Sequence, residues 1–330
     1  MKWVRVLASV LVLVVVSGGW VVYQHSYSVR EERVEIGDLR GVLALPESGA
    51  RHGLVVFVHG DGPIDATHST FYRPLWEAFA RAGYASLSWD KPGINGAPGN
   101  WLWQTMGDRV RETLDAVAWA RGRPEIDPER IGVWGASQAG WVVPAVARHP
   151  DVKFMIAVSP AVNWHQQGRF NLLASLEARG ASDEEVAAAL ARRETTLSHL
   201  RRGSSFEEYR TAVGDAVVRD AGMTADRWQF VSANHLSDAS ADLARVRVPV
   251  LLVLGGRDVN VDVADTEARY LRLVPGVRVV RYPDAAHDMT RGSFWDAVVA
   301  VVAPRSLFVD GYLADQRRFL EGLRGSAPPG

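Results

Sequence analysis

Two patterns of apolar and polar residues alternate along the chain and predict a regular succession of strands and helices. Short, mostly apolar runs are typical of strands in a buried sheet. They occupy residues 54–58, 84–89, 131–134, 153–158, 248–254 and 277–282. Apolar residues at helical spacing follow most of these runs, over residues 71–81, 107–121, 138–148 and 262–272. Such a succession predicts a mostly parallel central sheet that is covered by helices on both faces.

The succession begins with two further strands and is interrupted once. Alternating residues predict a pair of strands within residues 28–46. Between residues 163 and 242 the pattern is helical throughout. We therefore expect residues 28–162 and 243–325 to form one α/β core, with residues 163–242 inserted into it as a helical cap.

The first 27 residues carry a different pattern. Lys2 and Arg5 precede the apolar stretch Val6–Tyr23, and no charged residue follows until Arg30. A helix of this length spans about 27 Å, close to the thickness of the hydrocarbon core of a bilayer. The positive charges before the stretch predict a cytoplasmic N-terminus and an exported remainder.

Two interpretations of residues 1–27 stay open. The segment is either an uncleaved membrane anchor or a signal peptide, for which Ser17-Gly18-Gly19 would be a small-residue cleavage site. A third interpretation, a buried core helix, is disfavoured because the segment has no polar face. Both leading interpretations place the rest of the protein outside the cytoplasm, and contact with a membrane is expected through this segment only.

Composition narrows the classes of function. The 37 basic and 38 acidic side chains nearly balance, so nothing indicates a nucleic-acid partner. The absence of cysteine excludes disulfides, a cysteine nucleophile and a thiolate metal site. The nine histidines show no metal-ligand spacing, and the chain contains no phosphate-binding or dinucleotide-binding glycine motif. We therefore expect neither a metal nor another cofactor.

The sharpest chemical signal is the segment Gly132–Gly140, which reads GVWGASQAG. A strand runs into a tight turn there, Ser137 is at the apex, and a helix is expected directly after it. The small residues Gly135 and Ala139 allow the backbone to turn sharply, so that the serine hydroxyl projects outward. The alternative interpretation is an ordinary turn in which Ser137 only caps the helix.

Two residues later in the chain could activate Ser137. Asp258 follows the strand-like run at 248–254 and a glycine turn, and His287 follows the run that ends at Tyr282. The carboxyl ends of parallel strands meet at one edge of a sheet, where ligands bind in open α/β folds. A serine hydroxyl needs a base to take its proton, and the base needs an acceptor that fixes its tautomer.

Other acidic residues remain possible partners of the histidine. Asp262 is the main rival of Asp258, although a role as helix cap explains it better. Asp284 and Asp288 flank His287 and could contact it locally.

Together these features resemble the α/β-hydrolase superfamily. The turn around Ser137 is similar to its nucleophile elbow, GxSxG, although Ala139 replaces the second glycine and a glycine follows at Gly140. The chain order of serine, acid and histidine also matches. The turn His59–Pro63, which reads HGDGP, resembles the family's oxyanion turn. The resemblance covers about residues 30–325 and points to bacterial esterases, dienelactone-hydrolase-like and acylaminoacyl-peptidase-like proteins.

The resemblance implies an α/β-hydrolase fold and assigns a role to each residue. Ser137 would be the nucleophile, His287 the general base and Asp258 the acid that orients the histidine. The backbone amides of Asp61 and Gln138 would form the oxyanion hole. The acidic side chain of Asp61, close to a negatively charged transition state, has no explanation at this level.

The expected function is that of a serine hydrolase that cleaves a carboxylic ester or thioester of a small molecule through an acyl-enzyme. The candidates for lining an apolar substrate pocket are Trp101, Trp103, Trp141 and Trp164. A peptidase or amidase of the same fold and an acyltransferase remain alternatives, and a non-catalytic binding protein is a weaker one. The sequence carries no prediction of the oligomeric state.

Overall fold

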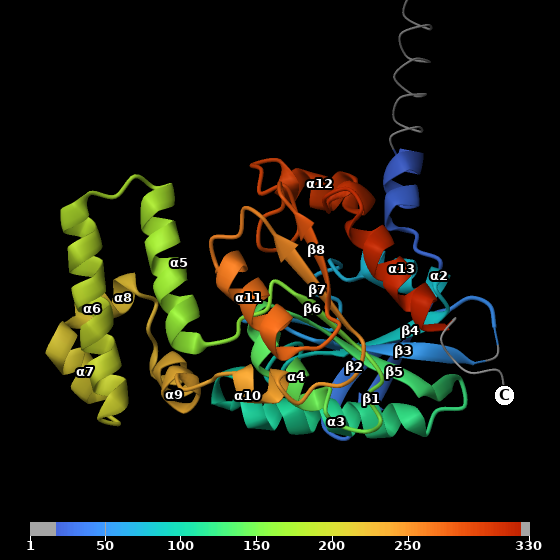
Figure 1. The fold of residues 1–330 in the computed structure, drawn as a ribbon, viewed down its shortest axis with the longest axis horizontal. Helices are drawn as coiled ribbons and strands as arrows, with labels where there is room; N and C mark the ends of the chain where they lie inside the picture. The colour runs from blue at the N-terminus through green and yellow to red at the C-terminus, as the bar shows by residue number, and fades with distance from the viewer. Residues whose placement is uncertain (1–17, 50, 325–330) are drawn as a thin grey trace, which may run out of the picture.

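The computed structural model describes residues 18–49 and 51–324, and its centre is one eight-stranded sheet (Figure 1). The strands lie side by side in the order β1-β2-β4-β3-β5-β6-β7-β8. They are β1 Val29–Ile36, β2 Leu39–Pro46, β3 His52–Val58, β4 Tyr84–Trp89, β5 Ile126–Ala136, β6 Met155–Val158, β7 Val250–Gly255 and β8 Arg278–Tyr282. β2 pairs antiparallel with both β1 and β4, and every other neighbouring pair is parallel. The predicted fold class is confirmed.

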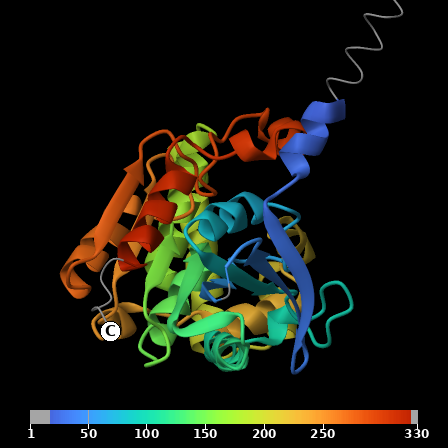
Figure 2. The ribbon, with the colours of Figure 1, turned by 90° about the vertical axis from the view of Figure 1, so that its right-hand side faces the viewer.

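Helices cover both faces of the sheet because strand residues alternate between two apolar layers. Leu54, Val56 and Val58 of β3 pack on one side, whereas Val55 and Phe57 pack on the other. The first layer is completed by α3 Met106–Arg121, α4 Val143–Val146, α10 Ser240–Leu243 and α11 Val263–Leu273. The second layer is completed by α2 Arg73–Arg81 and α13 Tyr312–Arg324, which lie side by side (Figure 2). Between β8 and α13 the chain forms α12 Asp296–Val302 and the short η3 Pro304–Ser306.

One predicted helix is wrong. In place of a continuous helix over residues 138–148, the chain forms the 3₁₀ turn η2 Ser137–Trp141 and then the single turn α4. Pro144 is near the start of α4 and has no N–H to donate to a preceding turn, so it cannot continue a helix from Ser137. The predicted strand at 131–134 is longer than expected, since β5 begins at Ile126.

The predicted helical stretch between residues 163 and 242 is found between β6 and β7. It consists of α5 Trp164–Ala178, α6 Asp183–Arg201, α7 Phe206–Val213, α8 Asp215–Asp220, α9 Ala225–Asn234 and then α10. Its two ends meet, because Asn163 pairs with Asp238 as an isolated bridge and the Ala239 amide donates to the Val162 carbonyl. Leu197, Tyr209 and Trp228 belong to a separate small apolar cluster within this stretch. Whether these helices fold as a domain of their own stays a prediction.

Most of the predicted membrane segment lies outside the described residues, which begin at residue 18. Residues 18–25 are helical and project from the body of the molecule (Figure 1). Among residues 18–49 and 51–324, no helix is both long enough and apolar enough to cross a membrane. The interpretation of residues 1–27 therefore stays a prediction.

Candidate active site

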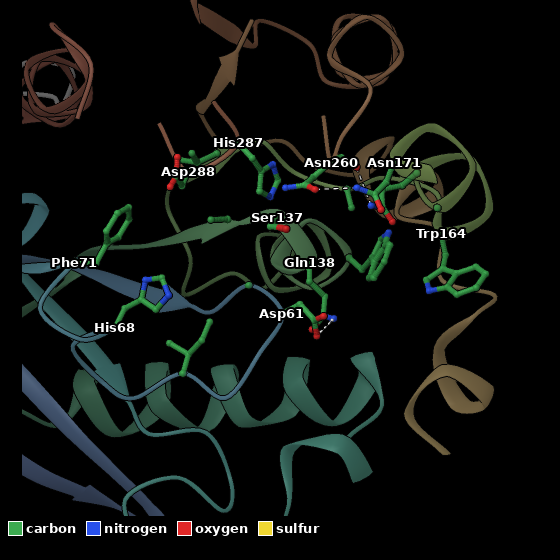
Figure 3. Close-up of a pocket in the computed structure, with 18 of the residues that line it drawn as sticks. Asp61, His68, Phe71, Ser137, Gln138, Trp164, Asn171, Asn260, His287 and Asp288 are labelled. Atoms are coloured by element: carbon green, nitrogen blue, oxygen red, sulfur yellow. Dashed lines mark hydrogen bonds between the residues drawn. The ribbon is translucent and has the colours of Figure 1, made fainter. Parts of the chain in front are cut away.

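Ser137 is the first residue after β5 and has a backbone conformation that non-glycine residues rarely adopt. Its φ angle is 55°, in the left-handed region, between the end of the strand and the turn η2. Strain of this kind persists only where the surrounding structure enforces it, and it concentrates at functional sites. The sharp turn directs the side chain into a cavity (Figure 3).

Close packing in this turn requires glycine at positions 135 and 140. A Cβ added at Gly135 would lie 2.8 Å from the Ala139 Cβ, so the first position of the motif must be glycine. A Cβ added at Gly140 would lie 2.3 Å from the Ala161 carbonyl oxygen. The second position that requires glycine is therefore 140 and not 139, and the departure from the usual motif does not open the turn.

His287 is held by a buried carboxylate. Its Nδ1 lies 2.7 Å from Oδ2 of Asp258, whose side chain is fully buried. The other oxygen, Oδ1, accepts the backbone amides of Asn260 at 2.7 Å and Val261 at 2.9 Å. The carboxylate is thus fixed from both sides, and a donor at Nδ1 leaves Nε2 of the histidine free to accept a proton.

The rival acids have other partners. Asp262 caps α11 by accepting the Asp265 amide and also accepts Nε2 of Gln166 at 2.9 Å. Asp288 accepts the backbone amide and the hydroxyl of Thr290. Among the described residues, Asp258 is the carboxylate that contacts His287.

The cavity has a volume of about 550 Å³ and is lined by Ser137, His287 and residues of both the core and the inserted helices. In Figure 3, His68, Phe71 and Asp288 lie on one side of Ser137, and Trp164, Asn171 and Asn260 lie on the other. The volume is that of a small-molecule site.

Two buried cations hold the turn that follows β3. Lys91 is 2% exposed and donates to the carbonyls of Gly60 at 2.6 Å and Gly62 at 2.9 Å. Arg109, also buried, donates to the His59 carbonyl and, at 2.7 Å, to Oε1 of Gln138. Burial lowers the pKa of Lys91 well below its ordinary value. Gly60 packs against the Ser137 side chain, so these contacts fix the turn beside the serine.

The side chain of Asp61, which the sequence left unexplained, is paired with an arginine of the inserted helices. Arg227 of α9 donates to both carboxylate oxygens, at 3.0 and 2.7 Å, and Nε2 of Gln138 donates to Oδ1 at 3.0 Å. Burial alone would raise the pKa of Asp61, but the hydrogen bonds and charge of Arg227 outweigh it and hold the pKa below its usual value. The carboxylate is therefore ionised and neutralised in place.

Only two of the four predicted pocket tryptophans line the cavity. Trp141 and Trp164 do so, whereas the prediction for Trp101 and Trp103 is corrected. These two residues are the first and last of the 3₁₀ turn η1 Trp101–Trp103, which packs against α9. The Trp101 ring lies 5.8 Å from that of Phe230, and Nε1 of Trp103 donates to Asp226 at 3.1 Å. Both therefore join the core to the inserted helices.

His68, which no sequence motif indicated, also lines the cavity. His68, Ser69 and Thr70 have positive φ angles of 49°, 51° and 77°, and Asp65 fixes this turn by accepting the amides of Thr67 and Ser69. Nδ1 of His68 is buried without a hydrogen-bond partner. The only signal in the sequence is the run of turn-forming residues around it, which does not indicate where the ring points.

The described part of the chain contains no group of three or more His, Asp or Glu side chains that could hold a metal ion. The expectation that the protein needs no cofactor stays a prediction.

Comparison with known proteins places this arrangement in a family. The family model described as serine aminopeptidase, S33, matches residues 49–292, which is well over half of the chain. The chain belongs to the S33 serine aminopeptidase family. This family is part of the α/β-hydrolase superfamily that the sequence motifs predicted.

Relatives of the S33 protein are distant. An uncharacterised 31.7 kDa protein of Escherichia coli, from the traX-finO intergenic region, is 24% identical over 78% of this chain and 91% of its own length. Esterase EstD of Thermotoga maritima is 21% identical over 82% of this chain and 62% of its own length. The esterase Pf2001 of Pyrococcus furiosus superimposes with a TM-score of 0.57 at 16% identity, over 90% of this chain and 91% of that one. At such identity the structural likeness shows the fold alone.

Proposed function

We propose that this S33-family protein is a serine hydrolase that cleaves a carboxylic ester or thioester through an acyl-enzyme on Ser137. The observation that carries the proposal is the strained serine turn, which opens into the same cavity as a histidine fixed by a buried carboxylate. A serine, a base and an orienting acid around one cavity are the parts that nucleophilic acyl transfer requires.

The reaction proceeds in two halves. Nε2 of His287 takes the Ser137 proton as Oγ attacks the substrate carbonyl carbon, and Asp258 stabilises the imidazolium that forms. The tetrahedral intermediate collapses, the proton passes from His287 to the leaving alcohol or thiol, and an acyl-enzyme remains. Water then attacks this ester with His287 again as base, and the carboxylic acid and free Ser137 are released.

The negative oxygen of the tetrahedral intermediate needs hydrogen-bond donors. We assign the backbone amides of Asp61 and Gln138 to this role, since both residues line the cavity and Gly60, which precedes Asp61, packs against Ser137. Lys91 and Arg109 support the assignment by holding the carbonyls of this turn from behind, so that the turn keeps its orientation during the reaction.

The cavity lining favours an acyl or aryl substrate that carries a polar group. Phe71, Trp141 and Trp164 provide apolar walls on two sides of Ser137. His68 and Asn171 are polar groups among these walls.

An amidase or aminopeptidase is the second candidate. Two observations favour it: the family model carries an aminopeptidase description, and the acidic residue Asp288, a partner for a substrate ammonium group, lines the cavity. The acceleration over uncatalysed hydrolysis, measured on an aminoacyl p-nitroanilide and on a p-nitrophenyl ester of the same acyl group, would separate the two candidates, and a larger acceleration for the anilide would favour the peptidase.

Covalent labelling tests the nucleophile directly. The full-length protein is treated with a fluorophosphonate, and the labelled peptide is identified by mass spectrometry. We expect the label on Ser137 and its loss in Ser137→Ala, together with a fall in kcat for p-nitrophenyl esters of about 10³-fold or more.

Ser159 supplies a matched control. It is also the first residue after a parallel strand, β6, and has a positive φ of 40°, but it does not line the cavity. Ser159→Ala is expected to keep both labelling and turnover. Labelling that survives in Ser137→Ala, or a folded wild-type protein that takes no label, would remove Ser137 as the nucleophile and favour a binding function.

A further inference from the structure

Exposed apolar side chains gather on two segments that are far apart in the sequence. Of the thirteen large apolar side chains that are exposed among residues 18–49 and 51–324, nine belong to residues 18–25 or to residues 294–302. These nine, which we call the apolar face, are Trp20, Val21, Val22, Tyr23, Phe294, Trp295, Val298, Val301 and Val302. Phe294 is 89% exposed, and Val22, Trp295 and Val301 are each at least 64% exposed. Apolar clusters on this scale mark sites of interaction.

The two segments form one surface. The helix over residues 18–25 and α12 lie side by side in both views of the molecule (Figures 1 and 2). Nε2 of His25 lies 2.7 Å from the Val301 carbonyl oxygen, which joins the segments directly. The guanidinium of Arg305 lies over the Tyr23 ring at 5.2 Å and donates to the Ser26 carbonyl. These contacts fix the end of the first helix to the body of the protein.

The helix α12 is unusual for a surface helix because it lacks a polar face. Its sequence is DAVVAVV, and none of its residues is buried. The one charged side chain, Asp296 at the helix start, accepts hydrogen bonds from the amide and hydroxyl of Ser293. A helix that is apolar on all sides is normally covered by protein or by lipid.

We infer that the apolar face docks on the surface of a lipid bilayer, with α12 and the aromatic pair at residues 294 and 295 in the interfacial layer. The chain before Gly18 supports lipid as the occupant, because no charged residue occurs between Arg5 and that glycine. This apolar sequence leads directly into the helix that carries Trp20 and Tyr23. Tryptophan and tyrosine are the residues that favour the boundary between water and lipid. The inference rests on the prediction that residues 6–23 enter a membrane.

Docking would bring the lipid surface close to the proposed active site. Phe71 lines the catalytic cavity and also a groove beneath α12, where it is accompanied by Ala300 and Val301. A single layer of side chains thus separates the two. An ester held at the membrane surface would lie near the side of the cavity that carries His68.

The absence of cysteine makes a direct test possible. A single Val298→Cys or Val301→Cys in the full-length protein can carry one nitroxide spin label. The protein is reconstituted into vesicles of phosphatidylcholine and phosphatidylglycerol, and collision rates with oxygen and with a water-soluble nickel chelate are measured. Oxygen concentrates in lipid and the chelate in water. We expect both labels to collide with oxygen more often, and with nickel several-fold less often, than an exposed label in water.

Leu236 provides the matched control, since it is 74% exposed and belongs to the segment between α9 and α10. These two helices lie away from α12 in Figure 1. A label at Leu236→Cys should collide freely with nickel. Equal nickel accessibility at positions 236, 298 and 301 would overturn the proposal, as would protein that does not float with the vesicles. Dipolar coupling between labels at position 301 in vesicle-free protein would show a second copy on the face and overturn it too. None of these readouts depends on hydrolase activity.

Discussion

Arg227 of α9 forms a two-pronged ion pair with Asp61, the residue whose backbone amide we assign to the oxyanion hole. The two residues come from different parts of the molecule, the inserted helices and the turn after β3. The helix α9 is itself held on the core, because Asn234 accepts the Met106 amide at 2.8 Å and donates to the Gln104 carbonyl. Arg227 therefore occupies a fixed position, from which it neutralises a carboxylate that lines the same cavity as Ser137.

This geometry predicts that catalysis needs the positive charge of Arg227 because that charge neutralises the Asp61 carboxylate. In Arg227→Gln, the Asp61 carboxylate would face the developing oxyanion without its partner. Two like charges roughly 7 Å apart in a medium of effective dielectric constant about 20 repel by about 2 kcal/mol, which lowers kcat/KM roughly thirty-fold. Steady-state kinetics on a p-nitrophenyl ester measure this loss.

The double variant Asp61→Asn with Arg227→Gln separates charge from structure. If repulsion is the cause, removal of the carboxylate restores most of the lost kcat/KM, and the two substitutions show a strong coupling energy. A double variant as inactive as Arg227→Gln would instead mean that the arginine acts by packing or by direct contact with the substrate.

Lys91 offers a test of how the oxyanion turn is held. In Lys91→Met two buried carbonyls, those of Gly60 and Gly62, lose their donor. We expect the free energy of unfolding to fall by about 2–6 kcal/mol and kcat to fall with it, because each buried carbonyl left without its donor costs about 1–3 kcal/mol. Urea titration followed by circular dichroism gives the change in stability.

Lys153 is the matched control for that experiment. It is the only other lysine among the described residues, and it forms a partly exposed ion pair with Glu129 at 2.8 Å. Such pairs contribute about 0–1 kcal/mol, so Lys153→Met should be nearly as stable as the wild type. Equal losses in the two variants would show that the contacts of Lys91 have no special weight.

The sequence predicted the parts of the site that depend on the order of strands. Ser137, Asp258 and His287 each follow a parallel strand, and the ends of parallel strands meet at one edge of the sheet. Any chain with this order would bring the three residues together. Their catalytic roles remain proposals that the labelling experiment tests.

What the sequence could not predict depends on how the inserted helices pack. Asp61 and Arg227 are separated by 166 positions, and no local pattern links them. Trp101 and Trp103, which were expected in the pocket, contact the same helix, α9. The position of His68 was missed for a related reason, since three successive positive φ angles direct its ring. Tertiary contacts decide the first two cases, and the local turn held by Asp65 decides the third.

We predict that alanine has opposite effects at two glycines, Gly140 in the turn around Ser137 and Gly168 in α5. In Gly140→Ala the new Cβ would lie 2.3 Å from the Ala161 carbonyl oxygen, so the backbone must shift, at a cost of about 1–3 kcal/mol. Gly168, within α5, has no atom within 4 Å of an added Cβ, and Gly168→Ala should stabilise the protein by about 0.5–1 kcal/mol. Thermal unfolding of both variants checks the signs, and a stable, fully active Gly140→Ala would contradict the tight packing of the elbow.

Acid should weaken the fold through His59, which is buried between Tyr72 and Trp89. Nδ1 lies 3.1 Å from the Tyr72 hydroxyl, and Nε2 lies 2.6 Å from the Trp89 carbonyl oxygen. Burial, assisted by the charge of Lys91, lowers the pKa of His59 well below 6.5, so the folded protein keeps this ring neutral. As the pH falls below about 6.5, the unfolded chain binds a proton that the folded chain refuses, and stability is lost at up to about 1.4 kcal/mol per pH unit.

The window between pH 6.5 and 5 separates the effect of the buried histidines from that of the carboxylates. Carboxylates with lowered pKa values, such as Asp61 and Glu77, lose their contribution only at lower pH, when their unfolded forms begin to protonate. Burial also lowers the pKa values of His52 and His68, so part of the slope persists without His59. We expect His59→Gln, which can keep a hydrogen bond to Trp89, to lower the slope of unfolding free energy against pH by about one proton. Urea titrations at half-unit pH steps measure both slopes, and identical slopes would mean that His59 takes up its proton in the folded protein.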